Sequence, residues 1–62
     1  MPFVIKFIKD FEFVGTEPVT GTLEDAAVFA SKKLIEYDAD TAAVMDDADL
    51  KGEPRALVSK DA

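Results

Sequence analysis

The stretch FVIKFIK, residues 3–9, decides the fold of this chain, because its β-branched and aromatic residues predict a strand. Successive strand residues point to opposite faces of a sheet, so one face carries Phe3, Ile5 and Phe7, and the other carries Val4, Lys6 and Ile8. Both faces are therefore largely apolar. Since one helix covers only one side of a sheet, the stretch also predicts an apolar face that no helix covers.

The stretch TLEDAAVFASKKLIEY, residues 22–37, predicts that helix. Thr22 is a favourable N-cap and Asp25 stands where a capping box prefers Glu or Gln, so we expect a helix from Leu23 to about Tyr37. At helical spacing one apolar stripe is expected to face the sheet, with Val28 and Ile35 as a flanking ridge. The stripe consists of Leu23, Ala26, Ala27, Ala30, Leu34 and Tyr37. This pattern leaves Phe29 unexplained on the polar side of the helix.

Three further segments complete the expected order ββαββ. A second strand lies within residues 11–14 or extends towards Val19, and its register stays open. Lys9-Asp10 is not a favoured two-residue hairpin turn, so we expect either a looser turn or a first strand that bends at a bulge and continues. Residues 41–45 and 55–59 predict two more strands, joined by a loop over residues 46–54. The sequence thus predicts an α+β domain, a three- or four-stranded antiparallel sheet with one helix packed on one face.

The 62 residues leave room for a single domain over residues 1–62, with a smaller buried share than a typical domain has. Domains of this size are often stabilised by a disulfide, a metal or a partner chain. The chain has no Cys and no His, which removes the first remedy and most of the second. We therefore predict a homodimer.

The net charge of −6 argues against binding to nucleic acid or to an anionic membrane surface, both of which require clustered Lys and Arg. It favours a basic protein partner, or serves only to keep the chain soluble. No apolar run approaches the roughly 20 residues of a membrane span, and no signal peptide is evident at the N-terminus. We expect an unprocessed cytoplasmic protein.

The sequence offers no catalytic residues, because a chain without His or Cys lacks the usual general base and nucleophile. We therefore predict that the protein is not an enzyme and needs no cofactor. Its densest polar feature is an acidic patch, whose candidate members are Asp38, Asp40, Asp46, Asp47 and Asp49. Residues 47–52 resemble the opening of an EF-hand loop, but Lys51 and Val58 stand where ligands are required, so we predict no metal site.

The apolar sheet face that the helix leaves uncovered is the better candidate for a binding surface. If Phe3, Ile5 and Phe7 face the helix, the outward contacts expected for a homodimer are Val4, Ile8, Met45 and Leu57, with Phe29 as a secondary candidate. Two functions follow. The first is a small interaction or structural module that self-associates through this face. The second is an acidic inhibitor or nucleic-acid mimic, of the kind that mobile elements encode, that occupies a basic groove of a target protein.

Overall fold

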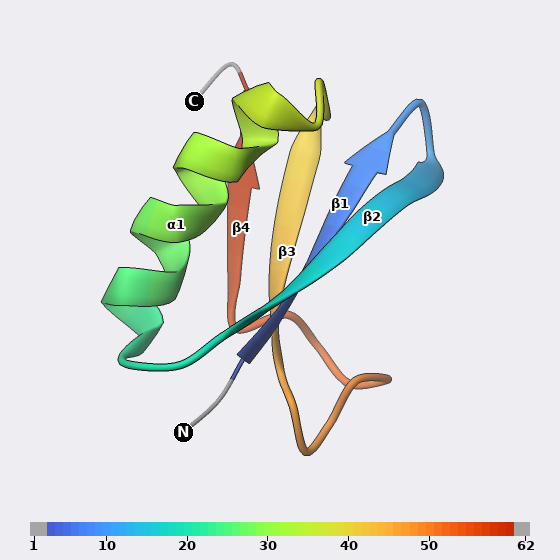
Figure 1. Cartoon of the computed structure of the whole chain (residues 1–62). Helices are drawn as coiled ribbons and strands as arrows, with labels where there is room; N and C mark the ends of the chain where they lie inside the picture. Colours follow the sequence, from blue (N-terminus) through green and yellow to red (C-terminus); the bar gives the residue numbers. More distant parts are fainter. Residues whose placement is uncertain (1–2, 61–62) are drawn as a thin grey trace.

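A computed structural model describes residues 3–60 and confirms the predicted α+β class and element order (Figure 1). The elements are β1 (Phe3–Lys9), β2 (Glu12–Val19), α1 (Leu23–Glu36), β3 (Thr41–Asp46) and β4 (Ala56–Ser59). The four strands form one sheet in the order β2-β1-β3-β4, and all neighbours are antiparallel. The helix lies across one face of this sheet. Within the described residues, no helix is long and apolar enough to cross a membrane.

Side chains and backbone fix both ends of α1. At the start, the Thr22 hydroxyl accepts from the Asp25 N–H at 3.1 Å, and the Asp25 carboxylate accepts from the Thr22 N–H at 3.3 Å. Asp25 therefore completes the capping box, although its side chain is shorter than the usual Glu or Gln. At the end, Asp38 adopts a left-handed conformation with φ of 54°. The N–H of Ala39 then reaches the Leu34 carbonyl at 3.0 Å, which is the Schellman closure.

The core lies between α1 and the face of the sheet that carries Ile5 and Phe7. It is made of small residues on the helix and larger ones on the strands: the cluster contains Ile5, Phe7, Ala26, Ala30, Leu34, Ala39, Ala42 and Val44. Alanine on the buried stripe lets the helix axis approach the sheet closely. The flanking ridge expected from Val28 and Ile35 does not pack against the sheet, because both side chains are exposed.

The connection between β1 and β2 is tighter than the sequence predicted. Lys9 pairs with Glu12, so Asp10 and Phe11 alone form the turn, with φ values of 51° and 68°. A two-residue hairpin with positive φ at both positions matches the twist of the strands it joins. The bulge expected in the first strand lies instead in β2, where a register shift leaves Val14 as the extra residue.

Candidate interaction surface

The strands present a second face on the side away from α1, which we call the outer face. Its residues follow from the register, because residues paired across an antiparallel ladder point to the same side. Ile8 pairs with Phe13 in β2, Val4 pairs with Met45 in β3, and Ala43 pairs with Leu57 in β4. The outer face consists of Val4, Lys6, Ile8, Phe13, Thr16, Pro18, Thr41, Ala43, Met45, Leu57 and Ser59.

Exposure on the outer face is uneven. Leu57 is 65% exposed and Phe13 is 68% exposed, whereas Val4 and Ile8 are half-buried. Met45 points to this side but is only 5% exposed. The structure therefore brings all four expected outward contacts to one face, and it leaves Met45 with almost no surface for a partner.

The loop between β3 and β4 accounts for the covered part of the outer face. In Figure 1 it extends to the side of the sheet opposite α1. The Lys6 ammonium donates to the Leu50 carbonyl at 3.0 Å, which ties the loop to β1 across this face. The same ammonium lies 5.5 Å from the centroid of the Phe13 ring. Lys6 therefore links the loop to an exposed aromatic side chain.

Phe29, the secondary candidate, does not stand on the polar side of the helix as the amphipathic pattern suggested. It is half-buried and packs against the core, with the Lys33 ammonium 5.6 Å from the centroid of its ring. Val28 and Ile35 are exposed in its place. The helix is thus rotated about its axis relative to the predicted stripe, and Phe29 contributes to packing.

The expected acidic patch is divided between the two ends of β3. Asp38 and Asp40 precede this strand, while Asp46, Asp47 and Asp49 follow or end it. Six strand residues at about 3.3 Å each place the two groups roughly 20 Å apart. From residue 3 to residue 60, no three acidic side chains converge on a point where a metal ion would bind.

Each acidic group has its own local partners. Asp46 accepts from the Ala48 N–H at 2.9 Å and faces the Arg55 guanidinium at 3.5 Å. At the other end, the Lys9 ammonium donates to Asp38 at 2.6 Å, which raises the pKa of Lys9 and lowers the pKa of Asp38. These contacts stabilise a turn at one end of β3 and the end of α1 at the other.

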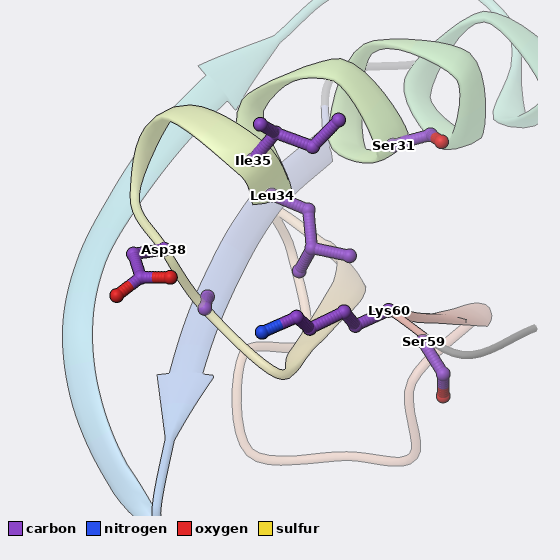
Figure 2. Close-up of a pocket in the computed structure, with 7 residues that line it drawn as sticks. Ser31, Leu34, Ile35, Asp38, Ser59 and Lys60 are labelled. Carbon is purple, nitrogen blue, oxygen red and sulfur yellow. The ribbon is translucent and has the colours of Figure 1, made fainter.

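A hollow of about 230 Å³ lies where the end of α1 meets the end of β4 (Figure 2). Leu34 and Ile35 line it from the helix, and Lys60 lines it from the chain after β4. The Lys60 side chain extends towards Asp38, and its charge further lowers the pKa of that carboxyl. The sequence patterns did not indicate this hollow, because its residues are distant in sequence and meet only through the strand order.

Two exposed aromatic residues, Phe11 and Phe13, were also missed by the sequence reasoning. Phe13 belongs to the outer face through a register that the sequence left open. Phe11 was considered only as a possible strand residue, whereas it occupies the turn and is fully exposed. The Phe-Glu-Phe sequence of residues 11–13 could have indicated exposed aromatic side chains. The bulge in β2, which the sequence does not reveal, decides to which face each ring points.

No protein-family model, curated protein or solved structure matches this chain.

Proposed function

We propose that the protein is a non-catalytic interaction module that self-associates through the outer face. One observation carries this proposal. The chain has 13 acidic residues, yet the strand positions of the outer face hold no carboxylate and only one charged residue, Lys6. Interfaces are depleted of Asp and Glu relative to the rest of the surface. Two copies meeting there would bring together strand positions that carry no carboxylate, in a protein that is otherwise acidic.

We expect this dimer to be weak. Met45 is almost fully covered, and the exposed apolar side chains Phe13 and Leu57 lie on the edge strands β2 and β4. We therefore expect a dimer that forms at tens of micromolar chain and dissociates on dilution.

Sedimentation velocity at tens of micromolar tests the proposal with a matched pair of variants. Wild type should sediment near twice the monomer mass of 6.7 kDa. Leu57→Lys should sediment as a monomer, because it places a charge within the expected interface. Ile35→Lys makes the same change at an 82% exposed position on the helix, and should leave the dimer intact. A wild-type monomer, or equal loss in both variants, would reject the outer face as the contact surface.

The second function, an acidic inhibitor or nucleic-acid mimic, stays a proposal with less geometric support. Its aspartates are divided between two ends of the sheet, whereas a basic groove favours a continuous row. Salt distinguishes the two functions. Binding through the aspartates should weaken steeply between low and high ionic strength, whereas the apolar dimer should not.

A cytoplasmic location and the lack of enzymatic activity belong to the same proposal. The absence of His and Cys from the chain supports the second of these, since no conventional nucleophile and base pair remains. Cell fractionation checks the first. Detection of the chain mainly in a membrane or extracellular fraction would contradict it.

A further inference from the structure

The turn between β1 and β2 presents an aromatic ring entirely to solvent. Phe11 has a relative exposure of 103%, the highest among the large apolar residues of the described chain. In Figure 1 the turn projects beyond the sheet, on the side away from α1. A ring in this position adds nothing to the core, so its burial remains available for a partner.

The backbone makes this placement costly. Phe11 has a φ of 68°, in the left-handed region where bulky residues are rare and where Gly is preferred in two-residue turns. A Gly here would relieve strain and remove an exposed apolar surface. Backbone strain of this kind concentrates at functional positions. The Phe11 ring is therefore a candidate for a functional role.

The turn is held in place and borders a hollow. The Asp10 N–H donates to the Asp40 carboxylate at 3.1 Å, and the Asp40 N–H donates to the Ile8 carbonyl at 2.8 Å. A hollow of about 250 Å³ lies against the turn, lined by Ile8, Asp10, Phe11, Asp40 and Thr41. The ring and the hollow together offer an apolar surface beside carboxylates, on a turn that is already ordered before any partner binds.

Charge selects the kind of partner. Four carboxylates surround the turn, from Asp10, Glu12, Asp38 and Asp40, against two ammonium groups, from Lys9 and Lys60. Lys9 is engaged by Asp38. Two such turns meeting in a homodimer would repel each other, whereas Lys or Arg of another protein would be attracted.

We propose that Phe11 and the adjoining hollow form a docking site for a basic segment of another protein, in which an apolar side chain is flanked by Lys or Arg. The apolar side chain contacts the Phe11 ring and fills the hollow. The flanking cations lie against Asp10 and Asp40, the two carboxylates that line the hollow. The hollow shares Ile8 and Thr41 with the outer face, whereas the Phe11 ring lies in the β1–β2 turn and the dimer contact at Leu57 lies on the edge strand β4.

The test uses random peptides displayed on phage, selected on the immobilised full chain and counter-selected on Phe11→Gly. Selected sequences should be enriched in Lys or Arg next to an apolar residue. Synthetic peptides from this selection, measured by calorimetry, should bind Phe11→Gly at least about tenfold more weakly and should retain binding to Phe11→Trp. Asp10→Asn should weaken binding and reduce its dependence on salt.

Two controls separate this site from the fold and from the outer face. Phe11→Gly should raise the midpoint of thermal unfolding, by about 4–8 °C if the relieved strain is about 1 kcal/mol, so lost binding cannot reflect unfolding. Ile35→Ser and Leu57→Lys should bind the peptides as wild type does. Failure to recover peptides that distinguish wild type from Phe11→Gly, or recovery of peptides without enriched Lys or Arg, would overturn the proposal. Self-association that is lost in Phe11→Gly would assign the turn to a second copy and overturn it equally.

Discussion

The two faces of the sheet are built from the same strands, but one is buried under α1 and the other is largely exposed. On the face under α1, Ile5, Phe7 and Val44 are fully buried, and the Phe7 ring stacks on Tyr37 with centroids 4.4 Å apart. On the outer face the residues between them in sequence are half-buried or exposed, apart from those near the β3–β4 loop. Apolar character alone therefore does not decide which face becomes the core.

The order in which the chain connects the strands determines which face becomes the core. Because β2 and β3 are each antiparallel to β1, they run parallel to one another on its two sides, and α1 is the crossover between them. Crossovers of parallel strands are right-handed in about 98% of cases, so the strand order selects the face that receives the helix. The other face keeps its apolar residues without a cover from the same chain.

The largest expected difference in unfolding free energy between the faces comes from replacing a leucine by alanine on each of them. Leu34→Ala removes a buried side chain from the core and should cost about 2–5 kcal/mol of unfolding free energy. Leu57→Ala should cost less than about 0.5 kcal/mol at chain concentrations low enough to keep the protein monomeric. Urea unfolding measures both. Similar losses in the two variants would mean that the outer face contributes to a core as much as the covered face does.

A second substitution tests how closely the covered face is packed at its edge. A Cβ at Gly15 would lie 2.5 Å from Cε1 of Tyr37, whose ring covers β2 there. Gly15→Ala should therefore cost about 1–3 kcal/mol, as overpacking does. Thr16→Ala, next along the strand but on the outer face, serves as the control and should change the free energy of unfolding little. Equal effects would contradict close packing at this edge.

The same tyrosine gives the covered face a dependence on pH. The Tyr37 hydroxyl donates to the Glu17 carboxylate at 2.5 Å, and this hydrogen bond raises the pKa of Tyr37. A raised pKa means that folding favours the protonated form, so the contribution is fully present below the unfolded pKa of about 10 and is lost as pH rises through the folded pKa. Urea unfolding between pH 8 and pH 11 should show a steeper loss for wild type than for Tyr37→Phe. Parallel profiles would contradict this.

The smallest expected effect concerns the loop beside the outer face. Hydrogen bonds and the Arg55 ion pair hold its first turn, with no convergent acidic ligands among the described residues. Thermal melts with excess chelator and with millimolar Ca²⁺ should coincide, and Asp49→Asn should behave as wild type does. A large rise in the midpoint with Ca²⁺, abolished in Asp49→Asn, would mean that the loop is a cation site.

The sequence predicted those parts of the fold that depend on local pattern. The alternation in residues 3–9 and the Thr22 cap led to a correct strand and a correct helix start, and residues 41–45 to a third strand that runs one residue further. The turn at Asp10 and Phe11 was not predicted, because a bulky residue at its second position opposes the usual preference for Gly there. The separation of the aspartates into two groups was not predicted for another reason. The two groups are close in sequence, and only the length and direction of β3 place them far apart.

The position of β1 between β2 and β3 has a consequence for synthesis and folding. This strand precedes both neighbours in the chain, and its second edge stays open until residues 41–46 arrive. An open edge between two apolar faces is prone to pair with other chains and aggregate. Lys6 and Lys9 interrupt the apolar run within the strand, as gatekeeper charges do. The two lysines thus protect the newly made chain during the interval in which its central strand has only one neighbour.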